Sequence, residues 1–95
     1  MANYQNILRQ AHQAIADVAD NADSWRAFLR SAAYTTHYAF PNQALIYSQR
    51  PGATMLADID TWNRAAGRWV NRGARGVASL GTGNMAGNVR YLFDI

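Results

Sequence analysis

The stretch "GVASLGTGNMAGNVRYLFDI", residues 76–95, decides the fold class of this chain. Its apolar runs "GVASL" and "VRYLFDI" are separated by a glycine-rich segment, a pattern typical of two strands joined by a hairpin loop. Residues 89–93 alternate imperfectly. The alternation places Val89, Tyr91 and Phe93 on one face of the second strand and Arg90 and Leu92 on the other. This part of the chain is therefore predicted to form a small antiparallel β-sheet.

Upstream of residue 76 the apolar spacing changes to that of helices. Apolar residues recur every three or four positions from about residue 4 to 20 and again from about residue 25 to 38. The break between the two patterns is short, which favours an antiparallel helix pair. Asp23 lies in this break and is predicted to cap the second helix.

Two shorter helices are expected before the strands. Pro41 is placed as the first-turn proline of one, and the Pro51–Gly52 pair ends it. Asp58 is predicted to cap the other, which runs through Trp62 to Ala66. Between them "ATMLA" is short enough to be extended. Helices thus come first and strands last, which predicts an α+β fold with N-terminal helices packed on a small C-terminal antiparallel sheet.

Length and composition bound the class of protein. The 95 residues fit one domain, and apolar residues make up 49% of the chain, enough for a globular core. There is no cysteine, which excludes disulfides, thiolate metal sites and thiol nucleophiles. The sequence contains no apolar run long enough to span a membrane and no signal-peptide pattern. We expect a cytoplasmic protein.

The residues give little support for an enzyme. His12 and His37 are the only histidines, and neither has a second ligand at helical spacing, so no metal and no cofactor are expected. The Asp58–Asp60 pair lies at a helix start, where capping explains it. The glycine-rich "GTGNMAG" lacks the phosphate-loop pattern.

Positive charge is concentrated in the second half of the chain. All nine cations are arginine and all six acids are aspartate, for a net charge of +3. Residues 1–49 balance to zero, and residues 50–95 carry six arginines against three aspartates. Because arginine binds phosphate bidentately and stacks on rings, an anionic partner is the simplest reason for this asymmetry.

The segment "WNRAAGRWVNRGARG", residues 62–76, is the best candidate binding site. Its arginines suit backbone phosphates, its tryptophans suit unpaired bases, and its glycines allow a strand to approach the backbone. Trp62 is interpreted as a core anchor, whereas Trp69 is open between the core and stacking. The candidates in and around this segment are Arg64, Arg68, Trp69, Arg72, Arg75 and, on the last strand, Arg90.

The segment "PNQALIYSQRP" adds further candidates. Asn42 and Gln43 suit contacts with bases or backbone, Tyr47 suits stacking, and Arg50 joins the basic cluster. The alternative for Asn42 is structural, as a cap of the short helix.

A resemblance covers about residues 25–95. Residues 37–80, "HYAFPNQALIYSQRPGATMLADIDTWNRAAGRWVNRGARGVASL", followed by "VRYLFDI", resemble the N-terminal domain of ArdC-type antirestriction proteins. They are also similar to the related module that opens large helicase and methyltransferase proteins of mobile elements. The shared pattern is an aromatic before "NQ.LIY.QRP.AT", a tryptophan, "GR.V.RGARG" and a strand ending "FD". Residues 1–24 then form a leading helix of the same single domain, residues 1–95.

The resemblance implies single-stranded DNA binding without enzymatic activity, since the family's separate metalloprotease-like domain has no counterpart here. We therefore expect a sequence-tolerant single-strand-binding module of a bacterial mobile element or phage. The residues do not distinguish between DNA and RNA as the bound strand. The alternative is a protein-interaction module of antirestriction type that binds other proteins of a mobile-element assembly without nucleic acid. A helix-turn-helix reader of duplex DNA is disfavoured, because the arginines lie on a turn and strands.

Overall fold

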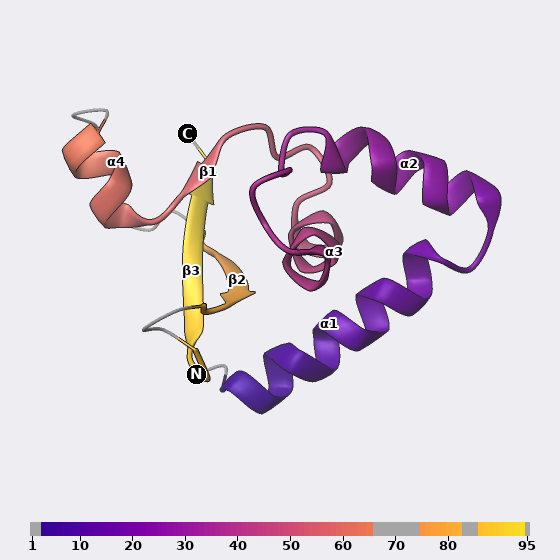
Figure 1. The fold of residues 1–95 in the computed structure, drawn as a ribbon, viewed down its shortest axis with the longest axis horizontal. Helices are drawn as coiled ribbons and strands as arrows, with labels where there is room; N and C mark the ends of the chain where they lie inside the picture. The colour runs from indigo at the N-terminus through magenta and orange to yellow at the C-terminus, as the bar shows by residue number, and fades with distance from the viewer. Residues whose placement is uncertain (1–2, 66–74, 83–85, 95) are drawn as a thin grey trace.

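The computed structural model describes residues 3–65, 75–82 and 86–94. Four helices come first and the two longer strands come last, as Figure 1 shows. The elements are α1 (Tyr4–Val18), α2 (Ala22–Ala32), α3 (Phe40–Gln49), β1 (Leu56–Ala57), α4 (Ile59–Ala65), β2 (Val77–Leu80) and β3 (Val89–Asp94). The predicted α+β class is confirmed.

The first two helices form a pair whose caps are both asparagines. The Asn3 side chain accepts a hydrogen bond from the Asn6 N–H at 2.9 Å, and the Asn21 side chain accepts one from Ser24 at 2.8 Å. The prediction that Asp23 caps the second helix is therefore wrong. Asp23 lies in the first turn of α2, where a carboxylate suits the helix dipole, and pairs with Arg26 at 3.1 Å.

Helix α2 ends at Ala32, six residues before its predicted end at residue 38. A turn follows the helix, in which the Thr35 N–H donates to the Ala32 carbonyl and the Tyr38 N–H to the Thr35 carbonyl, and Gln43 of α3 adds to these contacts. Its Nε2 donates to the carbonyls of Ala32 at 3.3 Å and Thr35 at 3.0 Å, so these acceptors have a partner on α3 as well as in the turn. The predicted apolar stripe of α2 is also less buried than expected, because Phe28 is its only buried residue.

The sheet has the strand order β1-β3-β2, with both pairings antiparallel. Leu56 lies opposite Asp94 in the first pairing, and Val77 lies opposite Leu92 in the second. Strand β3 is therefore central, and β2 occupies one edge. The predicted alternation of β3 is confirmed in the sense that Leu92 is fully buried whereas Tyr91 is exposed.

The core lies where α3 meets the sheet. Ile46 packs with Val77 and Leu92 on one side of α3, and Leu45 packs with Ala78 and with Ile7 of α1 on the other. Helix α3 is therefore wedged between α1 and β2, as its central position in Figure 1 indicates. Burial of these aliphatic side chains supplies the main stabilisation of the fold.

Helix α3 also closes the edge of the sheet. The Asn42 side chain accepts a hydrogen bond from the Leu80 N–H at 2.7 Å and donates one to the Leu80 carbonyl at 2.9 Å. Gln49 does the same for Ala78, at 2.9 and 2.8 Å. The interpretation of Asn42 as a helix cap is wrong, because Ala39 is the N-cap and Asn42 lies inside the helix with its amide turned to β2.

Helix α4 lies on the opposite side of β3 from α1, α2 and α3 (Figure 1). The Asp58 carboxylate accepts a hydrogen bond from the Thr61 N–H at 2.8 Å, which confirms the predicted cap. Trp62 is buried, and its indole Nε1 donates to the Phe93 carbonyl at 2.8 Å. Its interpretation as a core anchor is confirmed. Among the described helices, none is long and apolar enough to cross a membrane.

Candidate nucleic-acid interface

The predicted site residues divide into two groups. Arg68, Trp69 and Arg72 lie outside the residues that the structure describes. The other seven are described: Asn42, Gln43, Tyr47, Arg50, Arg64, Arg75 and Arg90. Most of this second group has partners within the protein, and those partners determine what each side chain has left to offer a ligand.

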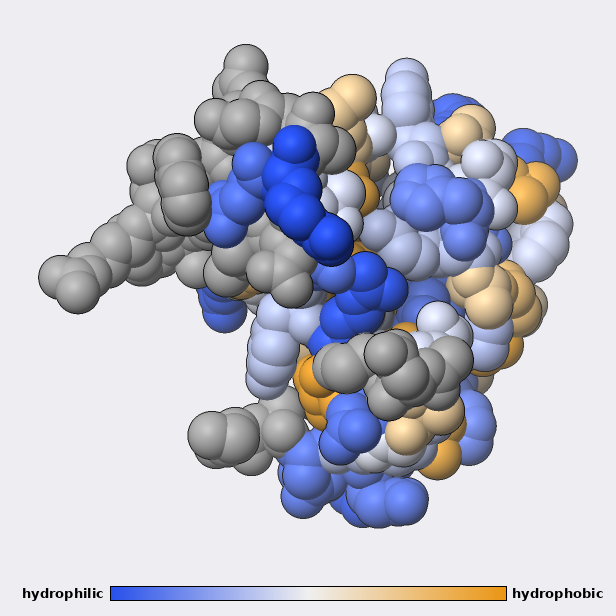
Figure 2. Space-filling view, turned by 60° about the vertical axis from the view of Figure 1, so that its left-hand side comes forward, coloured by the Kyte–Doolittle hydropathy of each residue, from blue (hydrophilic) through white to orange (hydrophobic). Residues whose placement is uncertain are grey.

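Arg64 and Arg75 flank the undescribed part of the basic segment and are both exposed. Arg64 is in the last turn of α4, and Arg75 lies two residues before β2. Figure 2 shows strongly hydrophilic side chains gathered across the middle of the face on which α4 lies. Gly76, next to Arg75, packs closely on β3, because a Cβ built there would lie 3.2 Å from the Phe93 ring.

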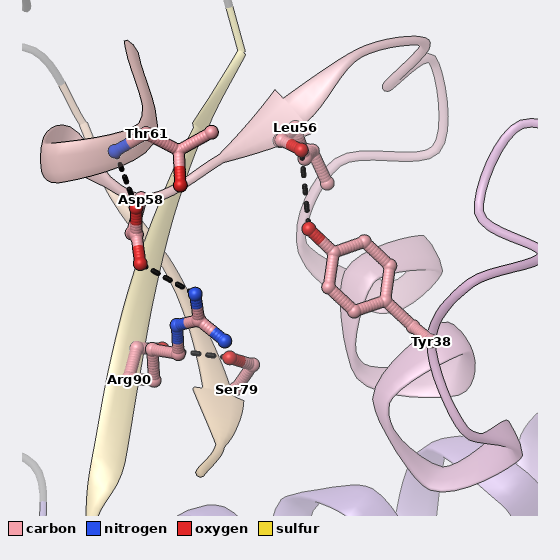
Figure 3. A network of polar contacts seen from close by, with 6 residues as sticks. All are labelled: Tyr38, Leu56, Asp58, Thr61, Ser79 and Arg90. Atoms are coloured by element: carbon pink, nitrogen blue, oxygen red, sulfur yellow. Dashed lines mark hydrogen bonds and ion pairs between the residues drawn. The ribbon is translucent and has the colours of Figure 1, made fainter. Parts of the chain in front are cut away.

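Arg90 belongs to a polar network beneath α4 (Figure 3). Its Nη2 pairs with Oδ2 of Asp58, and its backbone carbonyl accepts a hydrogen bond from the Ser79 hydroxyl at 2.8 Å. The same Asp58 caps α4. Arg90 therefore ties the start of α4 to the central strand, and its guanidinium is already engaged by a carboxylate.

The electrostatics of this network are set by Asp58. Hydrogen bonds from the side chain of Thr61, from Arg90 and from the Thr61 backbone lower the pKa of Asp58 from 3.8 to about 2. The nearby Tyr38 hydroxyl donates to the Leu56 carbonyl at 3.1 Å, and burial raises the pKa of this phenol. Asp58 is thus ionised at neutral pH, and Tyr38 is neutral.

Arg50 is partly free. Its Nε lies 3.4 Å from Oδ2 of Asp94, a carboxylate whose side chain is only 10% exposed. The Arg50 side chain is 47% exposed, so it neutralises a nearly buried acid and still reaches solvent. A guanidinium has five N–H donors, which leaves the terminal nitrogens of Arg50 available for a phosphate.

The three candidates on α3 all have internal contacts. The Asn42 amide closes the edge of β2, and the Gln43 amide caps the end of α2. Tyr47 is half-buried, and its ring packs edge-on against Phe28 with centroids 5.7 Å apart. These contacts give the "NQ" pair a structural purpose, and its role in nucleic-acid binding stays a prediction.

The ion pairs of the described residues localise the excess charge. Arg26, Arg50 and Arg90 each pair with an aspartate: Asp23, Asp94 and Asp58. Outside residues 59–76 the chain has five arginines and five aspartates. Residues 59–76 hold four arginines and one aspartate, which equals the whole net charge of +3.

Sequence reasoning missed one set of residues. Arg30 and Tyr34 border a pocket together with Tyr47 and residues 51–54. Their spacing of four residues on a helical pattern was the available signal, but the segment that completes the pocket lies some twenty positions further along the chain. Within the described residues, no three His, Cys, Asp or Glu side chains lie close enough to hold a metal ion.

Comparisons of this chain with protein-family models, with curated proteins and with solved structures found no match. The resemblance to the ArdC N-terminal domain is therefore a hypothesis that rests on the motifs in residues 37–80 and the strand after them.

Proposed function

We propose that this chain is a single-stranded nucleic-acid-binding module with weak sequence preference. The observation that carries the proposal is the location of the charge: the fold uses Arg50 and Arg90 to neutralise acids, and the net +3 remains in residues 59–76. A segment with four arginines, a net charge of +3 and an interleaved tryptophan suits phosphates and unpaired bases. The motif resemblance supports the same function in a mobile-element or phage protein.

In the proposed mechanism, the affinity for a single strand does not depend on its base sequence. Arg68, Arg72 and Arg75 bind backbone phosphates, and Arg50 adds a contact through the terminal nitrogens that Asp94 leaves open. Trp69 provides a stacking surface, to which every base presents a flat face. Phosphate contacts and stacking do not read base edges, so the binding tolerates any sequence.

The test is a fluorescence-anisotropy titration of a labelled single-stranded oligonucleotide at two salt concentrations, with the matching duplex as competitor. If about four phosphates are neutralised, log K falls with log salt with a slope of roughly −3 for a single strand. The double variant Arg68→Gln/Arg72→Gln should bind weakly and keep its circular dichroism spectrum. No binding at low salt, or binding that ignores salt, contradicts the proposal.

A matched control separates this segment from net charge alone. Arg9→Gln/Arg26→Gln removes the same two charges from the half of the chain whose net charge is zero. If both double variants lose affinity equally, the protein attracts nucleic acid only through its overall charge. If only Arg68→Gln/Arg72→Gln weakens binding, the site lies in residues 59–76.

A second function is favoured by a separate observation. Trp25, Leu29 and Phe40 are exposed on and beside α2, and the rings of Trp25 and Phe40 meet edge to face with centroids 6.1 Å apart. Exposed aromatic side chains are enriched at protein interfaces. If the oligonucleotide does not bind at low salt, we propose that the chain is a protein-interaction module, as in an antirestriction factor, and that Leu29→Arg disrupts it.

A further inference from the structure

A pocket opens between the end of α2, the side chain of Tyr47 and the turn that follows α3. Its volume is about 340 Å³, and Arg30, Tyr34, Tyr47 and residues 51–54 form most of its lining. Small-molecule sites begin at about 300 Å³, so the pocket is large enough for one small ligand unit and too small for a folded partner.

The walls of the pocket are aromatic. Tyr34 is 59% exposed, and Tyr47 is held in place by its edge-on contact with the buried Phe28. Neither tyrosine hydroxyl forms a hydrogen bond with another described residue. The walls therefore present flat ring surface together with hydroxyls that are free to donate or accept, a combination that suits a nucleobase.

Arg30 gives the pocket its charge. It is exposed in the last turn of α2 and is the only charged residue among the described lining. Arg26, one turn earlier, is paired with Asp23, whereas Arg30 pairs with no acid of the described residues. A guanidinium without a carboxylate partner donates strong hydrogen bonds to phosphate, so this end of the pocket favours an anion.

A neighbouring hollow differs from the pocket in charge. It has a volume of about 590 Å³, shares Tyr47 and Pro51 with the first pocket, and carries the carboxylates of Asp17 and Asp23. A phosphate is repelled by Asp17, since Arg26 balances the charge of Asp23, and it is attracted to Arg30. The exocyclic amino groups of a base, in contrast, are compatible with nearby carboxylates.

We propose that the pocket at Arg30 holds one nucleotide of the bound single strand, with its phosphate at Arg30 and its base against Tyr34 and Tyr47. This inference rests on the proposed function and adds a second contact with the strand, made by a pocket. Arg50 directly precedes the turn that lines the pocket, so a second guanidinium lies next to this turn in the chain.

The first experiment is a ¹H–¹⁵N NMR titration of the full chain with an oligothymidylate of about 12 nucleotides, within the range of single-strand site sizes. The proposal predicts shifts at the amides of Arg30, Tyr34, Tyr47 and Gly52. Shifts elsewhere without these four overturn the pocket and leave the proposed function intact. An absence of any shift at low salt overturns both.

Variants then test the two chemical parts. Tyr34→Ala should weaken binding of the same oligothymidylate about tenfold, and Tyr34→Phe, which retains the ring, should bind within about twofold of the wild type. Arg30→Gln should make the salt slope shallower by about 0.7, one phosphate's share.

The matched control is Arg9→Gln, which removes the same charge from an exposed position on α1 outside this pocket. It should leave the salt slope unchanged. If Arg30→Gln and Arg9→Gln behave alike, or if Tyr34→Ala binds as the wild type does, the pocket is not a nucleotide subsite.

Discussion

The side chain of Gln49 exchanges two hydrogen bonds with the backbone of Ala78, at 2.9 and 2.8 Å. Asn42, seven residues earlier on the same face of α3, does the same with Leu80. A carboxamide offers one acceptor and one donor, as a peptide group does, so two side chains of a helix replace the next strand of the sheet. Exposed strand edges are templates for unwanted pairing, and α3 covers this one.

Replacing Asn42 by alanine should destabilise the protein by about 2 kcal/mol, because the polar groups of Leu80 lose both partners in a largely buried position. Asn42→Asp should be at least as harmful, since its carboxylate would face the Leu80 carbonyl. The measurement is urea unfolding followed by circular dichroism. Gln13→Ala is the control: its amide bonds only Asp17 on the surface of α1, so a change below about 0.5 kcal/mol is expected. Equal stabilities of the two alanine variants would contradict the edge role.

Gly76→Ala should destabilise the protein by about 1 kcal/mol through a steric clash. The added Cβ would lie 3.2 Å from the Phe93 ring and 3.3 Å from the Cβ of Tyr91. Gly76→Ala should cost less free energy of unfolding in the Phe93→Leu background than in the wild type, because the smaller leucine leaves room for the added Cβ. Gly52→Ala is the matched control, because a Cβ there meets nothing within 4 Å and should be neutral or slightly stabilising. A thermal unfolding series of these variants provides the comparison.

The Asp58 network should make stability depend on acid pH. Its pKa in the folded protein is about 2, below the ordinary 3.8, so its stabilisation is complete above about pH 4 and is lost as the pH falls through 2. We expect about 1 kcal/mol, a value reduced for the screening of partly exposed charges. Asp58→Asn should therefore flatten the pH profile of unfolding between pH 4 and 2. A wild-type pH profile for Asp58→Asn would contradict this contribution of the network.

Arg50 should show a structural and a binding effect that can be separated. Arg50→Gln removes the partner of the nearly buried Asp94 and should cost about 1–2 kcal/mol, between the values for exposed and buried pairs. Asp94→Asn in the same background should restore most of that stability. Asp94→Asn alone should strengthen oligonucleotide binding about twofold, because Arg50 then no longer shares its charge. A double-mutant cycle with a coupling near zero would show that the pair does not interact.

The features that could be predicted from the sequence are those set by residues close together in the chain. The stripe of α1, the first-turn Pro41, the Asp58 cap and the strand pair are all local patterns, and the structure confirms them. Trp62 was predictable as a core anchor because tryptophan is strongly buried on average in soluble proteins.

The differences arise where a distant partner decides the outcome. Helix α2 stops at Ala32, whose carbonyl accepts from the Thr35 N–H and from the side chain of Gln43, eleven residues later. Asn42 binds a strand 38 residues away, which no local pattern reveals. At the start of α2, Asn21 and Asp23 are both good caps two positions apart, and propensity alone does not choose between them. The candidate site could be predicted only in part for the same reason. The distribution of charge in the sequence located the arginine segment, whereas the ion pairs of Arg50 and Arg90 are seen only in the structure.

The central position of β3 has a consequence for the order of events during synthesis. Strands β1 and β2 do not pair with each other, and each can pair only after β3 (Val89–Asp94) has been synthesised. A ribosome takes about 2 to 6 seconds to translate from Ala57 to Val89 at typical bacterial and eukaryotic speeds. During this interval the apolar faces of α1 and α3 have no sheet to cover them. We therefore expect apolar side chains of α1 and α3 to stay exposed on the nascent chain until β3 has been synthesised.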